Sequence, residues 1–567
     1  MSGIIFVVLS ITSALELYPA PQSAYMHEKK LFVIDSILPV VLQDETALPP
    51  YEPPDITPLY NALGYEPRLV SAALFDLGDE AIYIDIVSER SFFTKRSLRK
   101  YAPDPEESRP ATYYLTINAN GIFLAAVDRA GLHHGLYTLA QIISSSLEAG
   151  VNHRGIPAVP HLEIRDYPDM EIRAAYLHGP AARTHIQGYA ALKCNMLIFE
   201  SDDFYNLEGD RLLLWQEVFN EARQSGITPV PVFQIFNVPD VFLQQNPAAV
   251  EGRSRIDGLT LSSDDWAAFT QPNLIVTPEN PIRVVVDERD MHFRSDYTVS
   301  EGGLNPPFLA TYASPWMLRR IPGGSIPDGA ATSVTYSYAP PQSTALCPHA
   351  PETRVLVRAA LQRLIEGLEP AYIHGGGKEI SRINQDLRCR NRNKTHGETF
   401  LEAITLVHDI AVEIKRDMGM MIWVDALLPV SVSSRDQKDF DLYAPLSGLP
   451  GGLLLLAEFD GSECFEGGRA DAVLQWLDRH HMPRIGSVSV AEPASAYRIA
   501  RQIGAGGELA KGMILRDANP LDDATRVLLG KIWSSNSQHL CWPEGLNDFF
   551  ECTLWKPKFS ELKEALL

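Results

Sequence analysis

The sequence predicts an α/β fold: a (β/α)8 TIM barrel that follows a small α+β domain and carries a β-rich insertion between its third and fourth strands. From about residue 171 onward, short apolar runs alternate with amphipathic helical stretches, which is typical of βα units around a parallel sheet. Eight such units follow one another, which favours a closed barrel over an open sheet. The 567 residues, 45% of them hydrophobic, provide core material for two domains.

The eight expected barrel strands are short apolar runs bounded by turn residues. They cover residues 170–177, 194–200, 228–236, 371–373, 420–424, 452–457, 485–490 and 512–515. Apolar residues at helical spacing predict helices between them. One such helix has Leu214, Val218 and Ala222 facing inward and ends at Gly226, and another has its apolar face within residues 400–414.

Residues 15–160 are expected to form the small α+β domain, and residues 161–567 the barrel. Residues 113–117 and 121–126 read as two strands of a hairpin, followed by a helix over 130–143. Three prolines between residues 157 and 169 predict a linker to the barrel.

The excess between the third and fourth barrel strands, residues 274–340, predicts an inserted β-rich module. It contains three β-rich runs, at residues 284–286, 297–299 and 333–336, and two glycine turns, at 323–324 and 328–329. Two interpretations remain open. The module either covers the mouth of the barrel or is a surface elaboration without a catalytic part.

The charge balance excludes one class of partner. The chain has 71 acidic and 49 basic residues, a formal net charge of −22, so the phosphates of a nucleic acid would be repelled at long range. No interior run of about 20 apolar residues predicts a membrane span. The sequence does not indicate an oligomeric state.

The first residues resemble a leader. Residues 4–14 form a short apolar run that ends in the small residues 12–14, although no Lys or Arg precedes it. We therefore expect a signal peptide over residues 1–14 and a secreted or periplasmic protein. The alternative is a buried N-terminal strand in a cytoplasmic protein.

The six cysteines are widely spaced, with no CxxC pair and no His at zinc-ligand spacing. Most are expected to be buried thiols, and a late disulfide between Cys541 and Cys552 is the one alternative. No metal ion and no organic cofactor is expected.

Carboxylates follow several of the expected strands. They are Glu200, Asp202, Asp203, Glu379, Asp425, Glu458, Asp460 and Glu492. In a (β/α)8 barrel the reactive groups stand at the carboxyl ends of the strands. Cleavage of a glycosidic bond requires an acid for the leaving oxygen and a second group at the oxocarbenium-like centre, and carboxyl groups serve as both.

Each candidate residue has a functional and a structural interpretation. Glu379 is the predicted catalytic acid, and Asp425 or Glu458 is its predicted partner; otherwise they are retained polar groups at the rim. The predicted substrate-binding residues are Arg173, Asp202, Asp203, Tyr205, His374, Lys378 and Trp423. Tyr205 and Trp423 would offer a flat apolar face to a sugar ring. Arg173 would otherwise form a salt bridge inside the barrel, and Asp202 and Asp203 would hold neighbouring loops.

The order of several motifs along the chain resembles glycoside hydrolase family 20, the β-N-acetylhexosaminidase family. The matching segments are 19–22 and 113–143 of the small domain, then 164–168 with Arg173, 193–197 with 202–203, 374–379, 423–425 and 532–534. In particular, His374 with Gly376, Gly377 and Glu379 is similar to the family's His-x-Gly-Gly-Asp-Glu motif. The resemblance implies that Glu379 is the general acid and that Arg173 binds sugar hydroxyls.

The sequence also departs from that family. The family's Asp before the catalytic Glu orients the substrate's 2-acetamido group, and Lys378 stands there in this chain. The family's later Tyr is missing after the seventh expected strand, His178 replaces an Asp, and Arg516-Asp517 ends the eighth strand. A cation beside Glu379 would depress the pKa of a general acid unless Lys378 pairs elsewhere.

Two classes of function follow. The first is an exo-acting, β-hexosaminidase-like glycoside hydrolase with altered substrate preference, retaining or inverting, acting on an oligosaccharide or glycoconjugate. The second is a non-catalytic carbohydrate-binding protein on a degenerate hydrolase scaffold.

Overall fold

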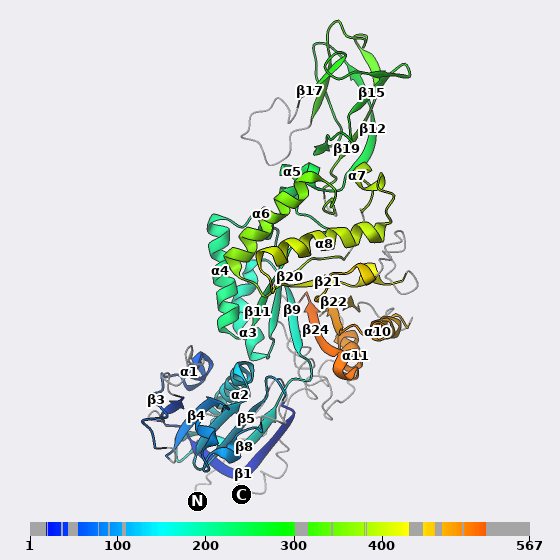
Figure 1. Cartoon of the computed structure of the whole chain (residues 1–567). Coiled ribbons are helices and arrows are strands. Elements are labelled where there is room, and N and C mark those ends of the chain that lie inside the picture. The colour runs from blue at the N-terminus through cyan, green and yellow to red at the C-terminus, as the bar shows by residue number, and fades with distance from the viewer. Residues whose placement is uncertain are drawn as a thin grey trace, which may run out of the picture.

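The computed structural model describes most of the chain from Leu17 to Asp517. The residues within this span that it does not describe are 18, 20, 36–37, 44–54, 77–78, 89–90, 105–108, 301–315, 342–343, 379, 381–382, 430–445, 460–467, 490 and 492. Figure 1 shows three parts along one long axis: a domain with β1 to β8, the barrel, and a β-rich extension at the opposite end.

The predicted barrel is confirmed. Eight parallel strands close in the order β9-β10-β11-β20-β21-β22-β23-β24, with β24 paired to β9. Their bounds are β9 Ile172–His178, β10 Met196–Glu200, β11 Thr228–Val232, β20 Tyr372–His374, β21 Gly419–Trp423, β22 Leu453–Glu458, β23 Arg484–Ser489 and β24 Ala510–Arg516. Each lies at an expected strand, with shifts of a few residues at the ends.

Side chains alternate between the inside and the outside of the barrel, as the pleat of a strand requires. The buried residues that pack inside it are Ile172, Ala174, Tyr176, Met196, Ile198, Val230, Val232, Met421, Trp423, Leu456, Ile485 and Ile514. The intervening residues, such as Ala175, Leu197 and Ile422, belong to the larger core between the strands and the helices.

Most of the helices surround the barrel and bury one face each against its core, whereas the short helices α5 and α7 lie near the insertion. Their bounds are α3 Ile186–Ala191, α4 Gly209–Gln224, α5 Asp240–Gln245, α6 Pro351–Leu368, α7 Leu387–Arg390, α8 His396–Ile414, α10 Arg469–Arg479 and α11 Pro493–Gly504. Thr395 and Glu398 form a capping box at the start of α8. The expected inward face of α4 needs one correction, because Leu214 is 39% exposed and Trp215 is buried instead.

The N-terminal domain is an eight-stranded sheet in the order β1-β8-β5-β6-β4-β2-β3, with β7 beside β8. Its elements are β1 Ser23–Val33, β2 Val40–Leu42, α1 Thr57–Leu63, β3 Leu69–Ser71, β4 Ala81–Ile86, β5 Tyr113–Asn118, β6 Gly121–Ala126, α2 Arg129–Glu148, β7 Asn152–His153 and β8 Ile156–Asp166. The predicted hairpin is β5 and β6, and the predicted helix is α2, extended by one turn at its C-terminal end.

Most of the expected linker is strand. β8 pairs with β1 along much of its length, and with β5 from Leu162 to Asp166. Pro157 and Pro160 lie in the half of β8 that β5 does not pair, where a missing N–H removes no bond to β5. The prolines are therefore compatible with a strand, and the sheet of the first domain runs to the entry of the barrel.

A buried ion pair joins the two domains. Lys193, before β10, lies with its Nζ 2.5 Å from Oδ2 of Asp166 at the end of β8, and both side chains are at most 1% exposed. The same carboxylate oxygen accepts a hydrogen bond from the Tyr113 hydroxyl at 2.8 Å. Burial lowers the pKa of Lys193, and Asp166 opposes that shift.

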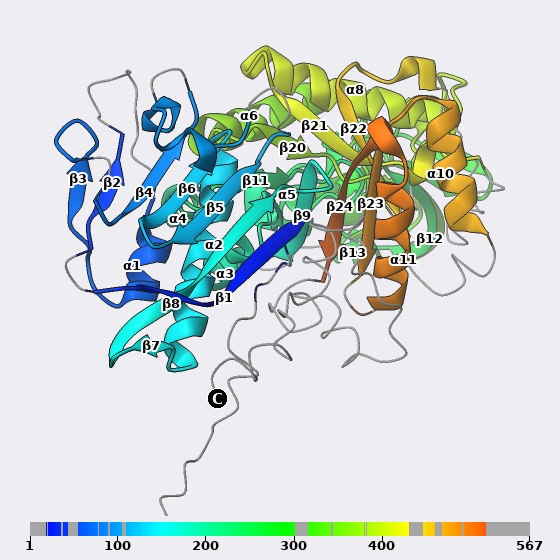
Figure 2. The same ribbon diagram turned by 90° about the horizontal axis from the view of Figure 1, so that it is seen from below.

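Figure 1 shows helix α2 between the first sheet and the barrel, and Figure 2 gives the same part of the molecule from below. The Tyr137 hydroxyl donates to the Gln187 side chain of α3 at 2.7 Å, and Tyr137 packs into the core of the barrel helices. The joint between the domains is thus partly apolar and partly ionic.

The β-rich insertion is confirmed, and it begins earlier than expected. β12 Arg253–Leu261 pairs along its whole length with β19 Ala330–Tyr338, so the module spans both strands. Its other strands are β13 Ala267–Ala268, β14 Leu274–Ile275, β15 Arg283–Val286, β16 Arg289–Met291, β17 Tyr297–Ser300 and β18 Met317–Arg320.

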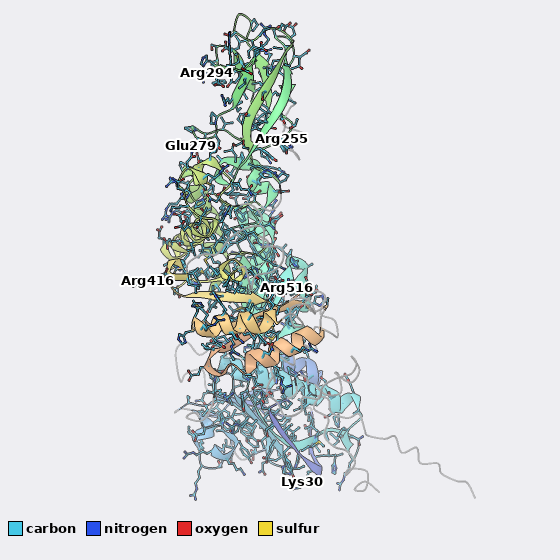
Figure 3. The ribbon with its side chains drawn as sticks, turned by 90° about the vertical axis from the view of Figure 1, so that its right-hand side faces the viewer. Lys30, Arg255, Glu279, Arg294, Arg416 and Arg516 are labelled. Atoms are coloured by element: carbon cyan, nitrogen blue, oxygen red, sulfur yellow. The ribbon has the colours of Figure 1, made fainter. Side chains whose placement is uncertain are left out.

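The described part of the insertion projects away from the barrel strands. In Figure 3 Arg255 and Arg294 lie at one end of the molecule, Lys30 lies at the other, and Arg516 of the barrel lies between them. Figure 1 gives the same arrangement from another side, which favours a surface elaboration over a cover for the barrel. Among the described residues, no helix has the length and apolar character needed to cross a membrane.

The Lys193→Met variant should lose about 3–5 kcal/mol of unfolding free energy, because it leaves Asp166 buried without its cation. Urea unfolding measures this loss. The matched control is Lys511→Met, which removes an exposed ion pair with Glu171 and should cost at most about 1 kcal/mol. Equal losses in the two variants would contradict the role given to the buried pair.

Candidate functional site

The alternation inside the barrel extends beyond its apolar core and places polar side chains at the carboxyl ends of all eight strands. In chain order they are His178, Glu200, Gln234, His374, Asp425, Glu458, Ser487 and Arg516. Each stands two residues after a side chain that packs inside the barrel. This is the end of a (β/α)8 barrel at which active sites are found.

Glu458, at the end of β22, forms ion pairs with two cationic side chains. Its Oε1 lies 2.7 Å from the Lys378 Nζ and 2.7 Å from an Arg516 nitrogen. The Glu458 side chain is 12% exposed, so these charges interact with little screening by water. Lys378 therefore has an acidic partner on another strand.

Two glycines form the turn that carries Lys378. Gly376 and Gly377 both have positive φ, of 74° and 100°. A Cβ on Gly376 would lie 2.2 Å from Oε1 of Gln234, so any other residue would displace that side chain and would also be strained by the positive φ. The glycine pair thus brings the Lys378 segment close to β11 and β21.

Asp425, directly after β21, is a buried carboxyl group with one free oxygen. Its Oδ1 accepts a hydrogen bond from Arg469 at 3.2 Å, and its Oδ2 has no hydrogen-bond partner among the described residues. Burial raises the pKa of Asp425 to about 6, and the neighbouring charge of Glu458 adds to the shift. Asp425 therefore holds a proton at mildly acidic pH.

Glu200, at the end of β10, is the centre of a second polar group. It accepts hydrogen bonds from the Tyr176 hydroxyl at 3.0 Å and from Nε2 of Gln234 at 2.6 Å. Nδ1 of His178 lies 3.3 Å from the same carboxylate. These contacts fix three inward side chains on neighbouring strands.

His374 and Trp423 lie deep at this end of the barrel. Their rings are 5.2 Å apart, and neither side chain is more than 3% exposed. Nδ1 of His374 accepts a hydrogen bond from the Gly376 amide, whereas its Nε2 and Oγ of Ser487 have no partner among the described residues. Burial lowers the pKa of His374 to about 3, so its imidazole is neutral at mildly acidic and neutral pH.

Asp203 and Tyr205 do not join this inward set. The Asp203 carboxylate accepts a hydrogen bond from Nε1 of Trp215 at 3.0 Å, and the Tyr205 hydroxyl donates to the Gln234 carbonyl at 2.5 Å. The Tyr205 ring stacks on Phe233 at 4.2 Å, so it does not offer a face to a sugar. The Asp202 side chain is exposed to solvent, but its carboxyl group is partly buried, and this burial together with the charge of Glu200 raises its pKa.

Arg173 lies at the other end of the barrel, near the start of β9. It is 2% exposed and donates to the backbone carbonyls of Lys193 and Met170, while His134 of α2 lies 3.4 Å away. This position does not fit the expected contact with sugar hydroxyls. The alternation explains why, since Ile172 and Ala174 face inward and Arg173 faces the domain junction.

Several predicted features lie outside the described residues. They are Glu379, Asp460, Glu492, the leader over residues 1–14, Cys541, Cys552 and the segment 532–534. The role of Glu379 as catalytic acid therefore stays a prediction. Two described residues that precede it in the sequence, His374 at the end of β20 and Lys378, lie at the carboxyl end of the barrel.

The catalytic and substrate-binding residues predicted from the sequence did not include Tyr176, Glu200, Gln234, Arg469 or Arg516. A signal for three of them was present, because counting in steps of two from the apolar interior of each strand reaches Glu200, Gln234 and Arg516. Arg469 comes from α10, and no local pattern links it to Asp425.

One group of side chains in the described part of the chain could hold a metal ion. It consists of Glu251, Cys347 and Cys389, and it lies outside the strand ends of the barrel. No such group is found at the described strand ends themselves.

Residues 14–167 match the family model "Glycosyl hydrolase family 20, domain 2". Three solved structures are similar over nearly the whole chain. The β-N-acetylhexosaminidase of Bacteroides fragilis has 13% identity and a TM-score of 0.57 over 97% of this chain and 95% of its own. The Flavobacterium johnsoniae chitobiase has 12% identity and a TM-score of 0.57 over 95% and 71%.

A family 20 exo-β-N-acetylglucosaminidase from Vibrio harveyi, in complex with N-acetylglucosamine, has 11% identity and a TM-score of 0.54 over 97% of this chain and 77% of its own. The resemblance to glycoside hydrolase family 20 is confirmed. At identities of 11–13%, these three structures share the fold of this chain and little of its sequence. No curated protein matches the chain.

The Asp425→Asn variant should change how stability depends on pH. The folded-state pKa of about 6 lies above the ordinary 3.8, so the folded protein binds this proton more tightly than the unfolded chain. The contribution of Asp425 is full below about pH 4 and is lost as the pH rises to 6. Relative to Asp425→Asn, the wild type should therefore lose about 3 kcal/mol across this window.

Urea unfolding at a series of pH values measures the difference. Asp471→Asn, on the exposed face of α10, is the matched control and should run parallel to the wild type. A constant difference between wild type and Asp425→Asn from pH 4 to 7 would show that Asp425 is ionised throughout.

Proposed function

We propose that this chain is an exo-acting glycoside hydrolase, related to β-hexosaminidases, whose substrate preference differs from theirs. The observation that supports this most directly is Asp425, a buried carboxyl group at the carboxyl end of the barrel whose Oδ2 has no hydrogen-bond partner in the described part of the chain. Glycosidases need two carboxyl groups at such a position. The substrate would be an oligosaccharide or a glycoconjugate.

The two catalytic roles are assigned as follows. Glu379 protonates the leaving glycosidic oxygen, and Asp425, in the ionised form that it takes above its pKa of about 6, stabilises the oxocarbenium-like centre or activates the attacking group. Asp425 suits the second role better than Glu458, because Glu458 is engaged by both Lys378 and Arg516. Its ion pairs would have to break before Glu458 could react.

The contact between Lys378 and Glu458 also bears on the acid. A cation in sequence next to Glu379 would favour the ionised form of that carboxyl group. The Glu458 carboxylate pairs with the Lys378 ammonium group at 2.7 Å and offsets its charge, which supports a general acid at Glu379. His374 Nε2 and Ser487 Oγ are further buried polar atoms suited to sugar hydroxyls.

Replacing either carboxyl group should abolish most of the activity. With aryl glycosides as substrates, Glu379→Gln and Asp425→Asn should each lower kcat by about 10²–10⁴-fold, the usual contribution of a positioned acid or base. The matched control is Glu352→Gln, on the exposed face of α6, which should leave kcat unchanged. If the wild type binds sugars without cleaving any glycoside of the panel, the chain is a carbohydrate-binding protein and not an enzyme.

The preference for the sugar's 2-substituent is a separate expectation. A cation occupies the position at which the family has the Asp that orients the acetamido group, so N-acetyl assistance should be weak. We expect kcat/KM for an aryl N-acetylglucosaminide to be no higher than for the corresponding glucoside. A strong preference for the N-acetyl sugar would contradict this part of the proposal and leave the glycosidase activity in place.

A further inference from the structure

Three chain segments meet at the foot of the insertion. Glu251 precedes β12, Cys347 follows β19, and Cys389 lies in α7, after β20. Glu251 and Cys347 flank the insertion. Cys389 belongs to the segment that follows β20 and contains Lys378. Residues separated by as many as 138 positions are thus brought together.

The two thiols and the carboxyl group of these residues lie close together in a buried space. The two sulfur atoms are 3.6 Å apart, and the Cys389 thiol donates to Oε1 of Glu251 at 2.8 Å. One ligand atom from each residue lies within 4.8 Å of the others. Cys347 and Cys389 are fully buried, and Glu251 is 2% exposed.

The separation of the sulfur atoms is close to that of two thiolates on one zinc ion. Tetrahedral coordination with Zn–S bonds of about 2.3 Å places two sulfurs about 3.8 Å apart. A disulfide would require them to approach to about 2.05 Å. Two thiolates and a carboxylate are ligands that zinc accepts in proteins.

Without a cation, the charged forms of Glu251 and Cys389 are disfavoured. The pKa of Glu251 is raised to about 7 by burial, and the thiol pKa of Cys389 is raised strongly by its contact with Cys347 and by burial. A divalent ion would displace these protons and leave one net negative charge on the three ligands. Arg388, next to Cys389 in the sequence, is the neighbouring cation that this charge would face.

The surrounding contacts hold Glu251 in place. Its Oε2 accepts a hydrogen bond from the Asp386 amide at 3.1 Å. The Asp386 carboxylate in turn accepts from the Gly252 amide at 2.9 Å and from Nδ2 of Asn280 in the insertion at 3.0 Å. Such outer contacts orient the ligands of metal sites.

We propose that Glu251, Cys347 and Cys389 form a structural zinc site that fixes the foot of the insertion to the segment after β20. The fourth position is filled by the second oxygen of Glu251 or by a water molecule. The site is separate from the glycosidase site, so its test does not depend on the proposed activity.

Metal analysis of the purified full-length protein tests this inference. With one equivalent of zinc sulfate added during refolding and free metal then removed by gel filtration, we expect about one zinc per chain in the wild type. The Cys347→Ser, Cys389→Ser and Glu251→Gln variants should each retain at least about fivefold less zinc. The matched control is Cys194→Ser, a buried thiol in the barrel outside the cluster, which should keep full zinc content.

Cobalt(II) substitution of the wild type gives a second readout that needs no variant. A thiolate-to-cobalt charge-transfer band, lost on adding zinc, supports the site. Absence of both zinc and this band overturns the proposal, as does a Cys347–Cys389 disulfide found by peptide mass analysis. Equal zinc in the Cys347→Ser variant and the wild type would also overturn it.

Discussion

The closed barrel imposes one constraint on which the rest of the site depends: along each strand, every second side chain must point inward. Ile172, Ala174 and Tyr176 fill the interior from β9, and the other strands contribute in the same register. Two residues further along each strand the interior ends and polar side chains begin. The site is therefore defined by the positions at which apolar filling stops.

The polar ends form two groups with different electrostatics. On one side Glu200 is surrounded by the donors Tyr176 and Gln234. On the other side Glu458 pairs with Lys378 and Arg516, while Asp425 is buried and no described residue hydrogen-bonds to its Oδ2. The ion pairs of Glu458 favour the charged form of one carboxyl group, whereas burial favours the neutral form of Asp425. Neighbouring carboxyl groups held in different states are a recurrent arrangement in acid–base enzymes.

The sequence was sufficient for the periodic parts of the fold, because hydrophobic patterning follows the period of each element. All eight barrel strands and the first hairpin could be located in this way. The errors arose where distant pairing decided the structure. β8 contains prolines but pairs with β1, and β12 is mostly exposed but pairs with β19. Arg173 was expected to bind substrate because of its motif, but it occupies the face of β9 that points toward the domain junction.

The joints between the parts of the molecule include buried charges, and the effect of these charges concerns geometry more than stability. Lys193 and Asp166 connect the first domain to the barrel. Asp386 and Arg388, paired within one segment, bond to the backbone of Gly252 and Val250 at the foot of the insertion. A buried ion pair gains little net free energy, since desolvation offsets the attraction. It does, however, penalise every arrangement that separates the two charges.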